Sequence, residues 1–395
     1  MDFFLLYLLL PNCYIQDITG ERQIEYSDIY CPDAEYLWHA KPGQGNIQFH
    51  KHYGAEKRTL LKCVACGKIF SERIGTIFYN RKHKEQTIIQ VFQCLCEGNS
   101  LSEVERITKV TRKTISAWLK AAASHVEEVS DYLLNNLHFT EIQLDEFWSF
   151  VKKKQNHLTE CEKLEGKYGN CWGHISFDPN SKMIPAHIFG KRTKENVHKL
   201  LEKFKSKTDG QLPLFTSDEY DVYPEAILNQ YHIKVEFPKT GDRGRPKHPL
   251  LVPHPDLNYV QVVKTREKGR VVKVETKLVF GSQEKVDEIL ANSKVSNSVN
   301  IAFVERSNLT ARQCNKRLAR KTNGFSKKQE KLEQQFNLFL AYYHFCRPHG
   351  GLRITLDEPQ KRRKYQNRTP AMAAGIADHI WDFKELFYYR VPAGT

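Results

Sequence analysis

The chain has 395 residues, of which 40% are hydrophobic and 27% are charged, and its formal net charge is +14. A chain of this length and composition forms two or three globular domains, which excludes a small disulfide-stapled scaffold. The positive charge favours a polyanionic partner, either nucleic acid or an anionic membrane surface, although charge does not predict a fold.

The N-terminal segment MDFFLLYLLLPNC carries an apolar run of about ten residues, roughly half of what a membrane-spanning helix needs. No basic residue precedes the run and no small-residue cleavage pattern follows it, which argues against a signal peptide. We therefore treat residues 1–29 as an N-terminal extension and expect a cytoplasmic protein with no membrane partner.

Residues 30–79 are rich in Gly, His and Cys and have little periodicity, which predicts a small irregular module. Cys63 and Cys66 form a C-x-x-C pair, a spacing typical of zinc ligands. Structural zinc takes four ligands, but only Cys31 lies upstream, and Tyr36 stands where a second Cys is expected. Zinc binding and a module that has lost its metal both remain open. Alternative ligands are Asp33, His39, His50 and His52.

A helical pattern begins at Glu85 and is interrupted by EGNS at 97–100. Asn99 or Ser100 is then expected to cap a short helix, and Thr111 to cap a longer one. We interpret residues 82–135 as a helix-turn-helix, although any helical hairpin would show this pattern. The side chains expected to face the DNA major groove are Arg112, Lys113, Ser116 and Lys120.

Alternating strand and helix signals follow in the next part of the chain. Strands are predicted at TEIQLDEFWSFV (140–151), GNCWGHISF (169–177), MIPAHIFG (183–190) and PLFTSDE (213–219), and helices at 193–207 and 221–231. Residues 238–258 hold many Pro, Gly and basic residues and predict a loop, with strands at 259–263 and 271–280. Long helices are predicted at 298–322 and 329–345, the second ending before Arg347-Pro348.

Three acids stand out because of their place in these elements. Asp145 and Asp218 end apolar strand segments, and Glu305 lies in an apolar helical stretch. Three converging carboxylates repel one another unless cations lie between them, and magnesium or manganese takes such oxygen ligands. Two such ions can support phosphodiester chemistry. The alternative for each acid is a solvated charge or an ion pair, and Glu146, Glu219 and Asp221 are neighbouring acids of that kind.

The segment around Glu305 adds basic and polar groups to this set. Asn308 and Arg312 follow Glu305 at spacings of three and four, so the three side chains share one helix face. An acid beside a cation suits a metal next to a DNA phosphate. Further residues expected to contact DNA are Lys152, Lys153, Lys154, Arg306, Lys316 and Arg317, although Lys152 to Lys154 could equally be a solvated strand end.

Several blocks together resemble the DDE transposases of bacterial and archaeal insertion sequences, of the insertion-sequence-one type. FVERSNLTARQ with DEFWSFV is quite specific, whereas either block alone is weak. The matching blocks are KCVACGKIFSERIGT (62–76), LDEFWSFVKKK (144–154), FTSDEYDVY (215–223), FVERSNLTARQCNKRLARKTNGFSK (303–327), YYHFCRPHGGLR (342–353) and RTPAMAAGIADHIW (368–381). They cover most of residues 30–390.

The resemblance implies an α/β fold: a ribonuclease-H-like mixed sheet flanked by helices over residues 138–395, with an insertion at about 238–297. A zinc-ribbon-like module and a helix-turn-helix would precede it. The family's two Asp and its Glu match Asp145, Asp218 and Glu305, which would bind magnesium, and its following basic residue matches Arg312. The family's ribbons carry a second Cys where Tyr36 stands, which puts the zinc in question.

The implied function is cleavage of DNA at terminal inverted repeats and transfer of the cut strand to target DNA, by a homo-oligomer at the nucleoid. A different class of protein, a DNA-binding regulator or a catalytically inactive relative, would use the N-terminal 135 residues and ignore the acids. A plain nuclease is a third alternative.

Overall fold

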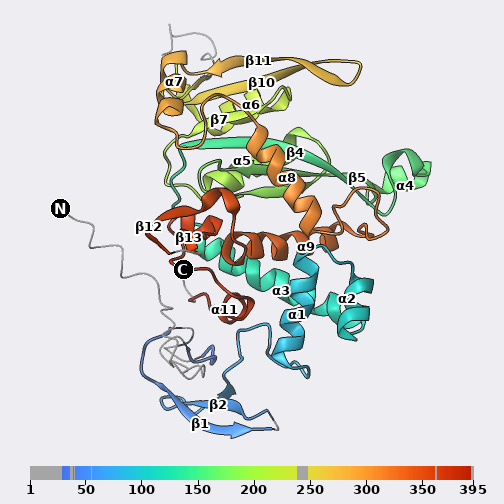
Figure 1. Cartoon of the computed structure of the whole chain (residues 1–395), viewed down its shortest axis with the longest axis vertical. Helices are drawn as coiled ribbons and strands as arrows, with labels where there is room; N and C mark the ends of the chain where they lie inside the picture. The colour runs from blue at the N-terminus through green and yellow to red at the C-terminus, as the bar shows by residue number, and fades with distance from the viewer. Residues whose placement is uncertain are drawn as a thin grey trace, which may run out of the picture. The chain divides into compact units, whose positions relative to one another are not determined.

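The computed structural model describes residues 29–35, 39, 41–54, 56–237, 248–360 and 363–392 (Figure 1). Apart from Ile29, the expected N-terminal extension lies outside the described residues, and so does Tyr36. The described chain forms two compact units. One contains the residues up to Gln86 together with those from Lys384 onward, and the other spans Thr87–Phe383.

The first unit is built on a three-stranded antiparallel sheet in the order β1-β2-β3. The strands are β1 (Ile47–Tyr53), β2 (Arg58–Cys63) and β3 (Ile69–Ser71). Leu61 and Cys63 of β2 point into a small core, whereas Lys62 between them is exposed, as strand alternation requires. The sequence prediction of an irregular module missed this sheet because its strands are short and mostly exposed.

The second unit begins with α-helical segments whose caps agree with the sequence. They are α1 (Glu85–Cys96, which starts in the first unit), α2 (Leu101–Thr108) and α3 (Arg112–Leu133). Ser100 caps α2 in a reciprocal capping box with Glu103, and Thr111 caps α3. Each cap satisfies backbone N–H groups that a helix start leaves open. The predictions of both helix starts are confirmed.

A six-stranded mixed sheet forms the centre of this unit, in the order β11-β10-β7-β4-β5-β6. Strand β4 is parallel to β7, and β7 is parallel to β10, while the other neighbouring pairs are antiparallel. The bounds are β4 (Glu141–Val151), β5 (Gly169–Phe177), β6 (His187–Gly190), β7 (Leu214–Asp218), β10 (Asn258–Glu267) and β11 (Arg270–Phe280). The α/β class and a mixed sheet flanked by helices are therefore confirmed.

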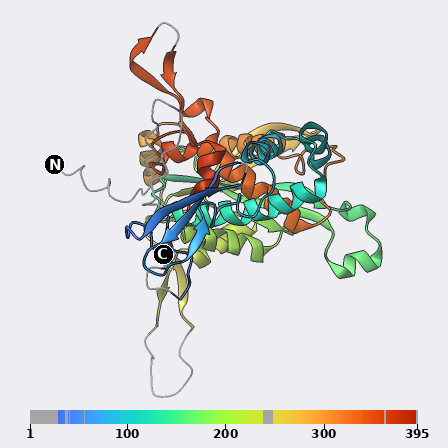
Figure 2. The same ribbon diagram turned by 90° about the horizontal axis from the view of Figure 1, so that it is seen from below.

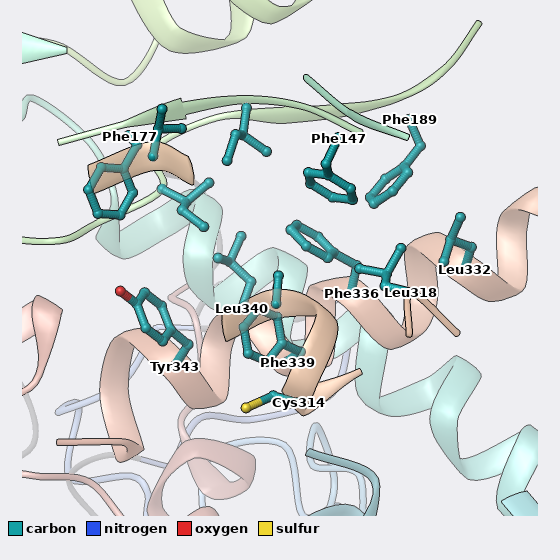
Figure 3. Packing of buried hydrophobic residues seen from close by; sticks show 14 of the residues in the cluster. Phe147, Phe177, Phe189, Cys314, Leu318, Leu332, Phe336, Phe339, Leu340 and Tyr343 are labelled. Atoms are coloured by element: carbon teal, nitrogen blue, oxygen red, sulfur yellow. The ribbon is translucent and has the colours of Figure 1, made fainter. Parts of the chain in front are cut away.

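One sheet face packs on α8 (Ala302–Cys314) and α9 (Gln329–Ala341) through a buried apolar cluster (Figure 3). The ring of Phe336 from α9 lies 6.1 Å from that of Phe147 and 5.0 Å from that of Phe189. Each fully buried side chain of this size contributes roughly 1.5–3 kcal/mol. On the opposite face, Phe204 of α5 (Lys194–Lys205) packs edge-on against Phe215 of β7.

The remaining elements are peripheral to this sheet. They are α4 (Glu160–Glu165), α6 (Val222–Gln230), β8 (His232–Val235), β9 (Leu250–Pro253), α7 (Gln283–Asn292), β12 (Ile354–Gln360), β13 (Arg363–Gln366), α10 (Pro370–Ala373), α11 (Phe383–Tyr388) and short 3₁₀ or π turns at Gln155–His157, Tyr342–Cys346 and Gly350–Leu352. Figure 2 shows the β12–β13 hairpin projecting from the second unit. None of the described helices combines the length and apolarity needed to cross a bilayer.

Three sequence predictions were wrong in extent. The helix predicted at 298–322 ends at Cys314, because Asn315 is fully buried with extended backbone (φ −128°, ψ 106°) and its side chain accepts the N–H of Arg317. A local polar turn of this kind competes with the helix. Strand β9 forms inside the predicted loop 238–258, of which 238–247 lies outside the described residues. Strand β6 keeps only the second half of its predicted range.

Candidate functional site

Two of the predicted acids lie on neighbouring parallel strands. The last paired residues of β4 and β7 are Leu144 and Ser217, and Asp145 and Asp218 come directly after them. Neighbouring strands are about 4.8 Å apart and side chains alternate between the faces, so the two carboxylates belong to the same face of the sheet. The structure therefore brings Asp145 and Asp218 together.

Strand alternation also separates Asp145 from its neighbour Glu146. Asp145 Oδ2 accepts a 2.7 Å hydrogen bond from Nδ2 of Asn308 on α8. Glu146 points to the opposite face, where the hydroxyl of Tyr223 on α6 donates to Oε1 and Arg192 donates to Oε2 at 3.0 and 3.1 Å. The Glu146 side chain is only 1% exposed, so its charge is neutralised inside the fold.

Asp145 is in a strongly acidic and poorly solvated position. Burial, together with the charges of Glu146, Asp218 and Glu305, raises the pKa of Asp145 to about 7. Burial and the charge of Glu146 also raise the pKa of Asp218, although the nearby Arg192 opposes this shift. Carboxylates that resist ionisation because of burial and of neighbouring negative charge are the arrangement that a divalent cation relieves.

The third acid, Glu305, is held near this pair by the start of α8. The side chain of Gln143 on β4 donates to the carbonyl of Asn300 at 2.7 Å and accepts the N–H of Val304 at 2.9 Å. Glu305 itself is half exposed, and its Oε1 lies 2.6 Å from Nζ of Lys264 on β10. The Lys264 ammonium therefore forms an ion pair with the carboxylate that we expected, from the sequence, to bind a metal.

The charges of Asp218 and Glu305 act on Asp145, but the three carboxylates do not form a tight ligand group. Among the described residues, the group of at least three metal-binding side chains with all ligand atoms within 4.8 Å is the thiol group Cys31, Cys63 and Cys66. The three acids do not meet this condition. An ion at Glu305 would share that carboxylate with the Lys264 ammonium.

Arg312 is fixed beside the acids by the backbone. Its Nη2 donates to the carbonyl of Trp148 at 2.8 Å, and its Nη1 donates to the carbonyl of Leu318 at 3.1 Å. Burial lowers the pKa of Arg312, while the charge of Asp145 acts in the opposite direction. This guanidinium is thus a positioned cation on the helix face that also carries Asn308.

The residues expected to contact DNA through α3 are mostly exposed. Lys113 and Lys120 are exposed, and Ser116 is partly buried. Arg112 is 62% exposed at its side chain and pairs with Glu105 of α2 at 2.9 Å. These side chains are available on the outer surface of the helix, although one of their charges already has a partner.

The other basic residues expected to contact DNA differ in whether another side chain of the protein already binds their charged group. Both oxygens of Glu162 accept from Lys153 at 2.9 Å, and Lys152 lies 3.8 Å from the same carboxylate. Arg317 donates to Gln335 at 2.7 Å, and burial lowers its pKa to about 10. Lys154 lies over the Trp148 ring, Lys316 lies 3.8 Å from Glu103, and Arg306 is exposed.

The three thiols of the first unit form a group suited to zinc. The sulfurs of Cys31 and Cys66 are 3.4 Å apart, and Asn46 Nδ2 lies 3.2 Å from the sulfur of Cys63. Burial opposes ionisation of Cys63, but the N–H groups of Cys66 and Ala65 outweigh it and lower its pKa to about 7. Burial raises the pKa of the neighbouring Cys31 to about 12, so within this group Cys63 is the thiol most ready to bind a metal such as zinc as a thiolate.

His39 lies next to this group along the backbone, although its ring nitrogens are not within 4.8 Å of all three sulfurs. The backbone of His39 forms a parallel β-bridge with that of Cys31. The Nδ1 atom of His39 is buried and has no hydrogen-bond partner among the described residues. An unpartnered buried imidazole nitrogen is costly, and coordination would satisfy it. His39 is therefore the best placed of the four alternative ligands named above.

Sequence reasoning missed Arg192 and Lys264, which pair with the acids of the site. Neither lies in a motif, and a lone basic residue in a strand or loop carries no signal for its partner. Glu146 was noted only as a neighbouring acid. Its burial could have been inferred, because it lies in the middle of an apolar strand.

No known family model matches the chain, and no curated protein matches it closely enough to count as a relative. Inferences about function therefore rest on the geometry of the site.

Proposed function

We propose that the chain is a DDE transposase that cleaves DNA at the ends of a mobile element and joins the freed strand to target DNA. The observation that carries the proposal is the placement of Asp145 and Asp218 on one sheet face, where burial, together with the charges of Glu146, Asp218 and Glu305, raises the pKa of Asp145 to about 7. Strongly perturbed carboxylates cluster at functional sites.

The fold supports this proposal at a coarser level. Strands β6, β5 and β4 run antiparallel, and β7 and β10 continue from β4 in parallel, which is compatible with a ribonuclease-H-like sheet. The insertion expected at about 238–297 spans β9, β10, β11 and α7, of which β10 and β11 belong to the six-stranded sheet. Helices α2 and α3, with the left-handed Lys109 (φ 60°) between them, are compatible with a helix-turn-helix.

Asp145, Asp218 and Glu305 would hold magnesium or manganese, and hard oxygen ligands fit those ions. When bound, the ions would supply Lewis-acid chemistry at a phosphodiester. Asn308 orients the carboxylate of Asp145, and Arg312 places a fixed positive charge near the phosphate. Arg192 neutralises Glu146 on the far face, so that Glu146 does not compete for the ions.

Zinc in the first unit would be structural, with Cys31, Cys63, Cys66 and His39 as ligands. Joining two DNA ends to one target requires at least two protomers, so a homo-oligomer on DNA is part of the proposal. The helices α2 and α3 would bind the terminal inverted repeats.

Purified protein and labelled DNA carrying the element's ends test this proposal. Strand transfer in magnesium is the expected result. Binding without cleavage would favour a DNA-binding regulator, and cleavage without joining would favour a nuclease. Asp145→Asn is expected to abolish cleavage and leave DNA binding intact, whereas the matched control Glu219→Gln, an exposed acid next to Asp218, should leave both unchanged.

A further inference from the structure

The first unit contains a cavity of about 390 Å³ that the proposed function does not use. It lies where β1 ends, β2 begins and the chain leaves β3, and Arg58, Arg73, Arg81 and Lys82 line it. Arg58 begins β2 and Cys63 ends it, so the cavity is about 17 Å along the strand from the thiol group. It is therefore separate from the candidate zinc site.

The walls of this cavity are strongly cationic. None of the described residues that line it carries a carboxylate. Two neighbouring acids neutralise two of the four cations: Glu56 accepts from Arg58 at 2.7 and 3.0 Å, and Glu85 pairs with Nη2 of Arg73. Among the described residues, Arg81 and Lys82 have no carboxylate partner, so the cavity keeps a net positive charge of about two.

The Arg73 guanidinium gives the strongest indication that the cavity binds an anion. Arg73 is only 8% exposed, and its Nε and Nη1 are buried without a hydrogen-bond partner in the described part of the chain. Leaving buried N–H groups unsatisfied destabilises the fold, and an oxyanion that reached this guanidinium would remove that cost.

Arg81 is pre-positioned beside it. Its Nε donates to the carbonyl of Ile77 at 3.2 Å, which fixes the plane of the guanidinium. Asn80 before it has a left-handed backbone (φ 55°), which turns the chain sharply at this point. A planar guanidinium with free Nη groups matches the oxygens of a phosphate better than an ammonium does.

We propose that this cavity binds a phosphate group, with Arg73 at its base and Arg81 and Lys82 at its opening. The assignment of that phosphate to the DNA backbone rests on the proposed function. Inorganic phosphate shares the same chemistry, so an experiment has to distinguish the two sources. The cavity would add one phosphate contact to those made by α3 in the second unit.

The test uses the full-length protein and a fluorescent DNA duplex of mixed sequence. The dissociation constant is measured by anisotropy at several KCl concentrations, for the wild type and for the double variant Arg81→Gln/Lys82→Gln. We expect the slope of log K against log[KCl] to become shallower by about 0.9 for one lost phosphate contact. The control Lys51→Gln/Lys62→Gln removes the same charge from exposed positions on β1 and β2.

An equal change of slope in both double variants, or none in the cavity variant, would overturn the assignment to DNA. If inorganic phosphate weakens wild-type binding more than KCl of the same ionic strength, and this excess vanishes in the cavity variant, the cavity also takes free phosphate. If the cavity variant changes neither the slope nor the excess effect of inorganic phosphate, the cavity is not a phosphate site. These measurements need no cleavage, so a protein that binds in this way but never cuts DNA would contradict the transposase proposal alone.

Discussion

Asn308 donates from Nδ2 to Oδ2 of Asp145 at 2.7 Å and so joins helix α8 to strand β4 across 163 positions of the sequence. Asn308 is buried, and on the next turn Arg312 is fixed to the carbonyl of Trp148. One helix face therefore sets both the orientation of an acid with a raised pKa and the position of a cation beside it.

The pKa of Asp145 makes the stability of the protein depend on pH. Its folded-state pKa of about 7 lies above the ordinary value of 3.8, so the folded state holds a proton that the unfolded state releases. Stability is then lost as pH rises from about 4 to about 7. We expect Asp145→Asn to raise the free energy of unfolding by about 2–4 kcal/mol at pH 8 and by little at pH 4.

Urea denaturation at the two pH values, without divalent ions, measures this difference. Glu305→Gln is the control, because Glu305 is half exposed and its ion pair with Lys264 contributes less than about 1 kcal/mol. If Asp145→Asn changed the free energy of unfolding equally at pH 8 and pH 4, ionisation of this carboxyl would not destabilise the folded state.

Lys264 is expected to compete with a divalent ion for Glu305. Its Nζ lies 2.6 Å from Oε1 of that residue. Lys264→Met should release the carboxylate and tighten manganese binding by about two- to fivefold, the equivalent of one partly exposed ion pair. Isothermal titration of manganese measures the change. The control Lys273→Met, which removes an exposed lysine from β11, should leave the affinity as it is.

Glu146 is expected to be structural. Burial opposes its ionisation, but the nearby His174 ring, the hydrogen bond from Tyr223 and the charge of Arg192 outweigh burial and lower its pKa. Its contribution to stability is therefore present above the ordinary pKa of about 4.5 and is lost as pH falls below it. Glu146→Gln should cost about 3 kcal/mol at pH 7, because it removes the buried charge to which Arg192 and Tyr223 donate.

Thermal and urea unfolding measure this cost, and the difference from wild type should shrink in acid. Glu225→Gln on the same helix as Tyr223 is the control. It removes an exposed acid whose ion pair with Lys194 is also exposed, so we expect no measurable change. A tolerated Glu146→Gln at pH 7 would contradict the structural role.

The first unit is expected to contain one zinc ion per chain. Cys63→Ser should remove it, and His39→Ala should weaken its retention against a chelator, because zinc prefers four ligands. Elemental analysis and native mass spectrometry report the metal directly. His50→Ala is the matched control, since His50 lies exposed on β1. Equal zinc loss in the two histidine variants would exclude His39 as the fourth ligand.

Much of the architecture of the second unit could be predicted from the sequence. The caps at Ser100 and Thr111, and the apolar strand segments at β4 and β7, depend on local chemistry and periodicity, which a sequence shows. The pairing of β4 with β7 that aligns Asp145 and Asp218 is a long-range contact. Spacing alone could not predict it, and the prediction came from the family resemblance.

The features that could not be predicted from the sequence depend on tertiary contacts. The long helix predicted from 298 fails at Asn315 because the protein interior, not helix propensity, decides how that residue is bonded. Arg317 was expected at DNA, yet the fold commits it to Gln335. Lys264 lies on a strand of mixed polarity, and its pairing with Glu305 follows from packing across the sheet.

The apolar cluster between the sheet and α9 has a consequence for synthesis of the protein. The sheet face that carries Phe189 of β6 stays uncovered until Phe339 of α9, 150 residues later, has been synthesised. At about 5–20 residues per second, this interval lasts roughly 8–30 s on the ribosome. During that time a nascent chain would present several phenylalanine rings to solvent, so its yield in cells should depend on chaperones that bind nascent chains and should improve at low temperature.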